Sequence, residues 1–133
     1  MVLEYSININ ASAAKVWSVF TDAEITRRMG GEYISEWQPG SFFGWRGKEG
    51  ILYTHGKILE IEKERLLKHQ LFDGPEQTKL SSIITYILEY TGKHTLLLAK
   101  EEIMYPLDKA SIEGLNSGWN SGLNAVKEIA ESL

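Results

Sequence analysis

Glu101 is the side chain of this sequence best suited to acid–base chemistry. Strand-like alternation places Glu101 on the same face as Tyr86 and Leu97. A carboxyl group that faces an apolar interior favours its protonated form, which is the state that a general acid needs. An ion pair with Lys or Arg, or a position in water beyond the strand, would leave Glu101 without that role. Glu101 and Tyr86 are therefore the one candidate pair for catalysis.

The other reactive side chains form no recognised constellation. His55, His69 and His94 lack the spacing of a metal site, and His94 falls in a predicted turn. Residues 92–95, Gly-Lys-His-Thr, lack the upstream glycine and the following helix of a phosphate-binding loop. No serine has a His–acid partner that the sequence can place. The chain has no cysteine, which excludes disulfides and thiolate ligands and fits a cytoplasmic protein. We predict no assigned catalytic residue, no metal and no cofactor.

The composition is that of one ordinary globular domain, predicted over residues 1–133. The 133 residues are 43% hydrophobic and 24% charged. A formal net charge of −4 disfavours nucleic acid as a partner, because phosphate binding needs a concentrated basic face. No apolar run approaches the roughly 20 residues of a membrane-spanning helix, and the N-terminus lacks a signal-peptide pattern.

The N-terminal part alternates between strand and helix periods. Residues 2–9 alternate as a half-buried strand, and Ser12 is the predicted N-cap of a short helix. Thr21 and Glu24 have capping-box spacing, which predicts that Thr21 caps a second short helix. Gly30 and its neighbour Gly31 are expected to end that helix.

Six further strands and a long helix are predicted to follow. Pro106 ends the last strand, and Asp108 is the expected N-cap of a helix that runs to the C-terminus. This order predicts an α+β helix-grip fold, in which a curved antiparallel seven-stranded sheet surrounds the long C-terminal helix. The predicted turns between the six strands lie at residues 38–40, 47–50, 62–64, 73–75 and 91–93.

Two glycines interrupt the C-terminal helix beside its one tryptophan, in the stretch NSGWNSGLN at residues 116–124. A glycine inside a helix costs about 1 kcal/mol relative to alanine. Gly122 falls within the apolar arc of the helix and Gly118 at its edge. Either the glycines allow a close approach of neighbouring elements, or they leave a void beneath Trp119 for a small apolar molecule. The predicted arc holds Ile112, Leu115, Trp119, Leu123, Val126, Ile129, Ala130 and Leu133.

Five segments together resemble the START and birch-pollen-allergen superfamily, in the branch similar to the C-terminal domain of the Hsp90 ATPase activator. The segments are SAAKVWSVFTD, SEWQPGSFFGWRG, HGKILEIEKERLL, IITYILEYTGKHTLLLAKEE and LNSGWNSGLNAVKEI. The resemblance implies a helix-grip fold with a cavity between sheet and C-terminal helix. Its motifs fall on Val16-Trp17, the turn at 37–40, the strand at 56–58 and Gly118-Trp119. All of these are signatures of shape, and none is catalytic.

Strand parity and the resemblance together indicate which residues face the cavity. A turn centred on Thr91-Gly92 predicts the pairs Leu88 with Thr95, Tyr86 with Leu97, and Ile84 with Ala99 on the inner face. The outer face then exposes Ile87, Leu96 and Leu98, a patch that a homodimer partner could cover. In the hairpin over 41–58 the same parity turns Phe42, Tyr53, His55 and Lys57 outward. The predicted cavity residues are Phe43, Trp45, Leu52, Thr54, Tyr86, Leu97, Glu101, Leu115, Trp119 and Gly122.

Three functions stay open at this point. The first is non-catalytic binding of a small hydrophobic molecule, with Thr54, Tyr86 and Glu101 as polar anchors. The second, implied by the resemblance, is a chaperone-cofactor or stress-response module that acts through its surface on a protein partner. The third is a cyclase-like or hydrolase-like enzyme that would rest on Glu101 and Tyr86 alone.

Overall fold

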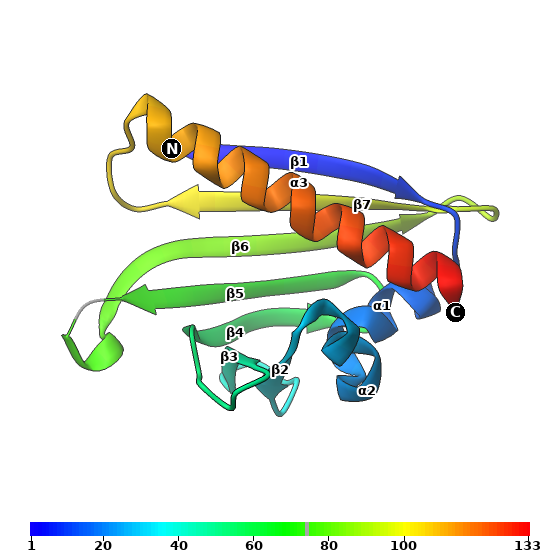
Figure 1. The fold of residues 1–133 in the computed structure, drawn as a ribbon, viewed down its shortest axis with the longest axis horizontal. Helices are drawn as coiled ribbons and strands as arrows, with labels where there is room; N and C mark the ends of the chain where they lie inside the picture. Colours follow the sequence, from blue (N-terminus) through cyan, green and yellow to red (C-terminus); the bar gives the residue numbers. More distant parts are fainter. Residues whose placement is uncertain (74) are drawn as a thin grey trace.

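A computed structural model describes residues 1–73 and 75–133 and has the predicted α+β helix-grip fold (Figure 1). The predicted turn at 73–75 has its central residue outside the described residues. The elements are β1 (Val2–Ile9), α1 (Ala13–Thr21), α2 (Ala23–Thr26), the 3₁₀ helix η1 (Arg27–Met29), β2 (Gly31–Ser35), β3 (Phe42–Gly47), β4 (His55–Glu62), β5 (Leu66–Asp73), the 3₁₀ helix η2 (Pro75–Gln77), β6 (Lys79–Tyr90), β7 (Thr95–Ile103) and α3 (Lys109–Ser132).

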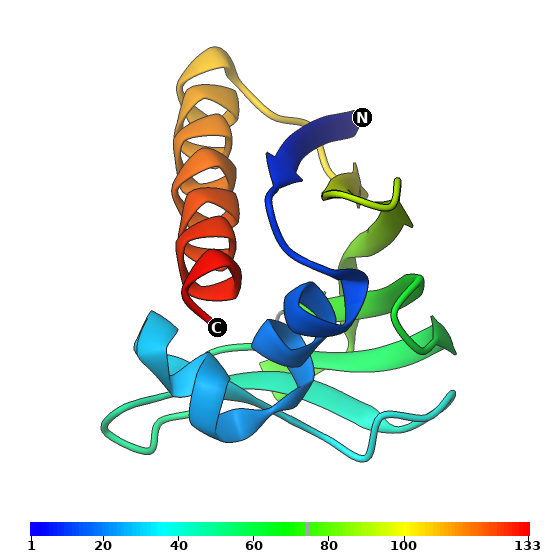
Figure 2. The ribbon, with the colours of Figure 1, turned by 90° about the vertical axis from the view of Figure 1, so that its right-hand side faces the viewer.

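The seven strands form one antiparallel sheet in the order β1-β7-β6-β5-β4-β3-β2. The first strand therefore closes beside the last, and the six later strands form the predicted meander. The sheet bends strongly between the β1–β7 end and the β2–β4 end, and α3 lies on its concave side with α1 and α2 (Figure 2). Neither the sheet nor α3 could bury its apolar face alone, so this layered arrangement supplies the core.

The long hairpin of β6 and β7 has the predicted faces but a different register. The structure pairs Tyr90 with Thr95, Leu88 with Leu97, and Tyr86 with Ala99. The predicted pairs were wrong by two residues, because the turn spans residues 91–94 rather than two residues. A shift of two keeps every side chain on its face. The inner set is buried, as expected: Ile84, Tyr86, Leu88, Thr95, Leu97, Ala99 and Glu101.

The two short helices begin and end largely as the sequence predicts. The Oγ of Ser12 accepts a hydrogen bond from the Lys15 amide, and Gly30 ends η1 with a left-handed φ of 97°. The second N-cap was predicted wrongly. Asp22, not Thr21, accepts the Glu24 amide hydrogen bond at 3.1 Å. Thr21 is still inside α1, where its hydroxyl donates to the carbonyl of Trp17.

Thr26 joins α1 to α2, and its replacement is expected to destabilise the fold. Its fully buried Oγ1 lies 2.6 Å from the Val19 carbonyl oxygen and 2.9 Å from that of Asp22. Thr26→Val keeps the shape but removes the hydroxyl donor to the Val19 carbonyl, whereas the Asp22 carbonyl still accepts the Thr26 amide. We therefore expect the unfolding free energy to fall by about 1–3 kcal/mol in urea titration. Thr21→Val, which removes one hydroxyl bond within a single helix, is the matched control and should cost clearly less. Equal losses would contradict the assigned role.

The C-terminal half of α3 packs into the core, and its N-terminal half stands further away. Leu123, Val126 and Ala130 are buried, whereas Leu115 and Trp119 are half-buried. The Asp108 carboxylate caps the helix by accepting the Ser111 amide hydrogen bond at 2.7 Å, as predicted. None of the helices in the described part of the chain combines the length and apolar composition that a membrane crossing requires.

The helix glycines face empty space rather than a closely packed neighbour. A Cβ atom placed on Gly114, Gly118 or Gly122 would meet no atom within 4 Å beyond the helix's own turns. The close-packing explanation of the glycines is therefore wrong for this structure. Gly56 in β4 shows the contrast, because a Cβ there would collide with the carbonyl oxygens of Gln70 and Phe43.

Candidate functional site

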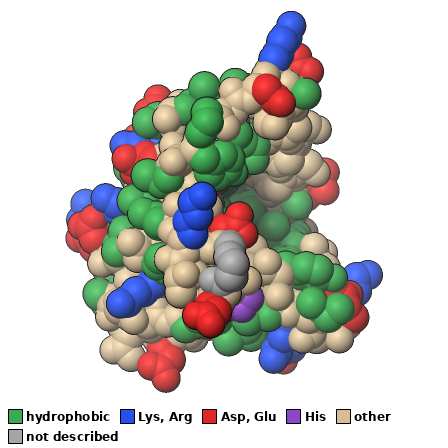
Figure 3. All heavy atoms as spheres, turned by 90° about the vertical axis from the view of Figure 1, so that its left-hand side faces the viewer, with side chains coloured by type: hydrophobic (Ala, Val, Ile, Leu, Met, Phe, Trp, Pro, Cys, Tyr) green, Lys and Arg blue, Asp and Glu red, His purple; other side chains and the backbone are tan. Residues whose placement is uncertain are grey.

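An aromatic pocket opens on the concave face of the sheet, with a volume of about 240 Å³. Beside the start of α3 the surface is hollowed, and hydrophobic side chains line the hollow (Figure 3). Aromatic rings form much of the pocket wall because β2, β3, β5 and β6 all turn large side chains toward it. The wall consists of Tyr33, Phe43, Trp45, Thr54, His69, Leu71, Ile84 and Tyr86.

A second, smaller pocket of about 60 Å³ lies under α3, next to Gly122. Tyr33 and Tyr86 border both pockets, so these two rings separate the space under the helix from the space over the sheet. The missing side chain of Gly122 leaves this inner space open. The remaining wall is Phe20, Met29, Trp119, Leu123 and Val126.

Tyr33 and Tyr86 are the polar pair at the boundary between the pockets. Burial raises the pKa of Tyr33 to about 12, and burial together with the neighbouring Tyr33 raises the pKa of Tyr86 well above its usual value. Both phenols are therefore neutral near pH 7 and able to donate or accept hydrogen bonds. Their rings are fixed by packing: the centroid of Tyr33 lies 4.8 Å from that of Phe43, and that of Tyr86 lies 4.9 Å from that of Phe20.

Trp119 is held between two tyrosines above a small residue of β7. Tyr5 and Tyr86 both pair with Ala99 in the sheet, which leaves a gap between their rings. The Trp119 ring fills this gap, with centroid distances of 5.5 Å to Tyr5 and 5.8 Å to Tyr86. Its Nε1–H donates a 2.8 Å hydrogen bond to Oε1 of Glu101. These contacts fix the tryptophan ring at the edge of the smaller pocket under α3.

Within the described part of the chain, Glu101 is neither paired with a basic side chain nor placed in water beyond the strand, the two situations that would have excluded it from acid–base chemistry. It lies within β7 and is 8% exposed, so it is not beyond the strand in water. Among the described residues no Lys or Arg forms an ion pair with it. Instead its hydrogen-bond donor is the Trp119 indole. The carboxylate therefore acts first as an anchor for Trp119.

The structure brings most, but not all, of the predicted cavity residues together. The larger pocket contains Phe43, Trp45, Thr54 and Tyr86, and the smaller one contains Trp119 and Gly122 with Tyr86. The other four predicted residues border neither of these two pockets. Leu52 forms a bridge to Arg46 at the end of β3, Leu97 is fully buried in the core, Leu115 is half-buried on α3, and Glu101 bonds to Trp119.

Sequence reasoning missed Tyr33 and the role of His69. Tyr33 lies opposite Trp45 in the β2–β3 pair, so the parity that turned Trp45 inward could have included it. His69 was considered only as a metal ligand. It is 3% exposed and packs against Phe43 with ring centroids 4.2 Å apart. Burial lowers its pKa to about 4, which keeps the imidazole neutral at pH 7.

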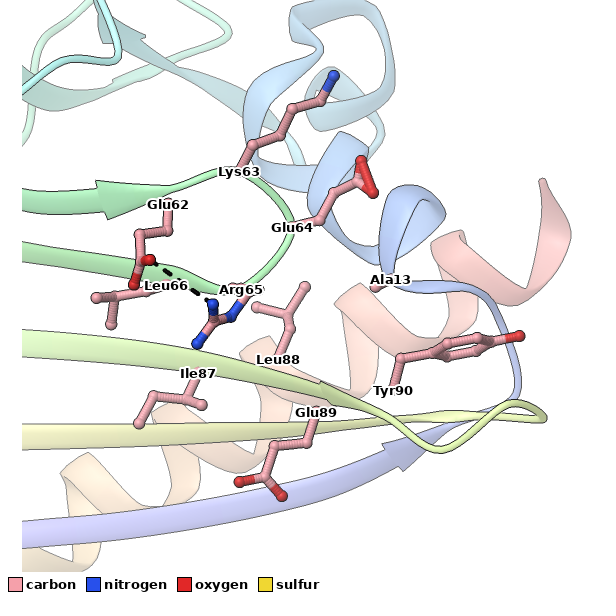
Figure 4. A pocket seen from close by; sticks show the side chains of 10 residues that line it. All are labelled: Ala13, Glu62, Lys63, Glu64, Arg65, Leu66, Ile87, Leu88, Glu89 and Tyr90. Carbon is pink, nitrogen blue, oxygen red and sulfur yellow. Dashed lines mark ion pairs between the residues drawn. The ribbon is translucent and has the colours of Figure 1, made fainter.

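The outer surface carries features of other kinds. Ile87, Leu96 and Leu98 lie on the outer face of β6 and β7, as predicted, but Ile87 pairs with Leu98. Ile87 is 39% exposed, whereas Leu96 and Leu98 are half-buried. A recess of about 700 Å³ at the β4–β5 turn is lined largely by charged side chains, among them the Glu62–Arg65 ion pair (Figure 4). Within residues 1–73 and 75–133, no group of three His, Asp or Glu side chains could hold a metal ion.

The curved antiparallel sheet and the long C-terminal helix on its concave side define the helix-grip class of proteins. Within that class, the chain belongs to the family described as Activator of Hsp90 ATPase homolog 1-like protein, whose model matches residues 10–131. The predicted family branch is thereby confirmed. No protein with a curated description matches the sequence.

Solved structures share the fold at low sequence identity. MLL2253 from Mesorhizobium loti is 16% identical, with a TM-score of 0.83 over 99% of this chain and 98% of that one. CalU16 from Micromonospora echinospora is 22% identical, with a TM-score of 0.76 over 97% and 75% of the two chains. The Aha1 dimer from Colwellia psychrerythraea is 17% identical, with a TM-score of 0.79 over 98% and 96%. At these identities the similarity establishes the fold alone.

Proposed function

We propose that this protein binds a small, largely apolar molecule in the two adjacent pockets and performs no chemistry on it. The observation that carries the proposal is the open space beside Gly122, in a helix where alanine would be favoured and would meet no neighbour. Glycine at position 122 lowers the stability of the helix, and in return it leaves the smaller pocket open. Binding is the use of that room that the aromatic walls support.

The pocket chemistry favours burial of rings over recognition of charge. Phe43, Trp45 and Tyr33 offer apolar faces, and each aromatic contact adds to the free energy gained from removing apolar area from water. Thr54 contributes less as an anchor than its type indicated, because its hydroxyl already accepts the Trp45 amide hydrogen bond at 2.8 Å. Tyr33 and Tyr86 hydrogen-bond to each other, and the donor and acceptor sites that this bond leaves can orient a ligand.

The test is native mass spectrometry of the protein purified from its own host, followed by denaturing extraction of any bound molecule. We expect a reproducible small molecule that is lost from the Gly122→Leu variant, because leucine fills the smaller pocket while the fold is kept. Gly114→Leu is the matched control, since Gly114 is exposed on the same helix and should leave binding unchanged. An empty protein with no thermal shift toward lipids and aromatics would refute ligand binding.

A chaperone-cofactor function is the second candidate, because the family description refers to an activator of the Hsp90 ATPase and the Colwellia neighbour is an Aha1 dimer. This function would use the surface, including the patch of Ile87, Leu96 and Leu98, alone or in a homodimer. It predicts stimulation of a partner ATPase that survives Gly122→Leu. Loss of stimulation in that variant would instead connect the activity to the pocket.

A catalytic function has less support from the site. Glu101 is bonded to Trp119, and neither of the two pockets has Glu101 in its wall. Glu101→Gln with full turnover of any substrate found would remove this candidate.

A further inference from the structure

His69 breaks the apolar pattern of the concave face. His69 lies on β5, where it pairs with Ile58 of β4 on one side and Ile84 of β6 on the other. All three side chains are buried on the interior face. An isoleucine would satisfy strand propensity and core packing at this place, whereas a buried imidazole must lose hydration. Departures from local rules of this kind occur at functional sites more often than in ordinary core.

The hydrogen bond of the ring defines which nitrogen carries the proton. Nδ1 of His69 lies 3.2 Å from the carbonyl oxygen of Gln70, which can only accept. Nδ1 is therefore protonated, and in the neutral ring Nε2 carries a free lone pair. Burial keeps the ring neutral at pH 7.

Nε2 of His69 has no hydrogen-bond partner among the described residues, yet it is not sealed in the core. The one fully buried side-chain nitrogen or oxygen without a partner in that part of the chain is Nδ1 of His55. Because His69 borders the larger pocket, the lone pair of Nε2 is accessible from that pocket. Because Nε2 is an acceptor without a donor from the described part of the protein, a ligand that donates a hydrogen bond to it would bind more tightly than one that cannot.

We propose that Nε2 of His69 is the polar anchor of the site and accepts a hydrogen bond from a planar aromatic ligand that carries a phenolic O–H or a ring N–H. This inference rests on the proposed binding function and names its ligand class. The Phe43 ring beside His69, the Tyr33 ring 4.8 Å from Phe43 and the Trp45 ring 4.9 Å from Tyr33 provide flat apolar surfaces for such a ligand.

The size of the pocket agrees with this class. A cavity of roughly 150 Å³ suffices for benzene, so about 240 Å³ has room for one or two fused rings. A long acyl chain would leave Nε2 without a donor, and burial of an unsatisfied acceptor lowers affinity. A site built with a hydrogen-bonding partner therefore discriminates against analogues that lack the matching group.

The experiment compares β-naphthol with its methyl ether and with naphthalene, by titration of the intrinsic tryptophan fluorescence. We expect the protein to bind β-naphthol about tenfold or more tightly than the ether, which cannot donate. In His69→Phe, which keeps a ring but removes the acceptor, the preference should fall to about one while naphthalene still binds. Equal affinity for naphthol and ether in the unsubstituted protein would overturn the anchor.

The outcomes separate the anchor from the underlying binding function. Binding of naphthalene without a preference for naphthol would refute the anchor and leave apolar binding standing. No binding of any of the three probes would refute both. A naphthol preference that persists in His69→Phe would assign the acceptor role to another group and overturn the proposal.

The imidazole nitrogen chemical shifts of His69 give a second measurement that does not depend on a substituted protein folding. In the free protein, Nδ1 should have the shift of a protonated nitrogen and Nε2 that of a bare one. β-Naphthol should move the Nε2 shift toward that of a hydrogen-bonded nitrogen, and the methyl ether should not. The opposite tautomer, or an Nε2 shift that ignores naphthol, would contradict the proposal.

Discussion

Between pH 6.5 and about pH 4 the protein should lose about 3 kcal/mol of its unfolding free energy through His69 alone. The pKa of the buried imidazole is lowered from 6.5 to about 4 because burial disfavours the charged form. Above pH 6.5 the ring is neutral in both folded and unfolded chains, so the stability is complete. As the pH falls below 6.5, His69 becomes protonated in the unfolded chain but stays neutral in the folded protein, until the folded ring is also protonated near pH 4. The loss is about 1.4 kcal/mol for each of about 2.5 pH units.

Urea unfolding at a series of pH values measures this loss, and His69→Phe is the matched variant. The difference in pH dependence between the two proteins isolates His69. The carboxylates with lowered pKa values lose their contribution at lower pH and are common to both proteins. They are Glu32, Glu49, Asp108 and Glu131. Parallel stability curves from pH 7 to pH 4 would mean that the imidazole is protonated in the folded state or is hydrated in solution.

The sequence was sufficient for the order of elements because each element is encoded locally. Alternation marked β1, Pro106 and Asp108 marked the boundary before α3, and Ser12 marked the start of α1. Cross-strand register needed more than this. The β6–β7 turn is held by a hydrogen bond from the Thr91 amide to the His94 carbonyl, with Gly92 at a φ of 92°. A four-residue turn and a two-residue turn share the same residue types here, so composition alone could not select between them.

The site was less predictable because contacts between distant segments create it. Periodicity assigns Trp45 and Phe43 to the inner face, but Tyr33 joins them only through the pairing of β2 with β3. The importance of His69 depends on which atom its Nδ1 meets, and the chain neighbour Gln70 supplies that carbonyl only in the folded strand. Glu101 was correctly expected to face inward. Its partner, the Trp119 indole, required knowledge of how α3 is seated over the sheet.

Replacing Gly114, Gly118 and Gly122 together by alanine should raise the unfolding free energy by roughly 2–3 kcal/mol. Each glycine costs a helix about 1 kcal/mol relative to alanine, mainly because glycine gains more freedom on unfolding. No atom within 4 Å opposes a Cβ at any of the three positions, so no packing loss offsets the gain. The midpoint of urea unfolding would rise without a change in its slope.

Gly56→Ala provides the control of opposite sign, because its Cβ would meet the carbonyl oxygens of Gln70 and Phe43 and must destabilise the sheet. A triple-alanine protein that is less stable than the original would mean that α3 sits closer to the sheet in solution, and that the glycines serve packing after all. A more stable protein that still binds its ligand would show that the space needed for binding exceeds a methyl group. Loss of binding in Gly122→Leu would then show that a larger side chain competes with the ligand for the same space. The helix stability lost through Gly122 would therefore be explained by the pocket beneath Trp119.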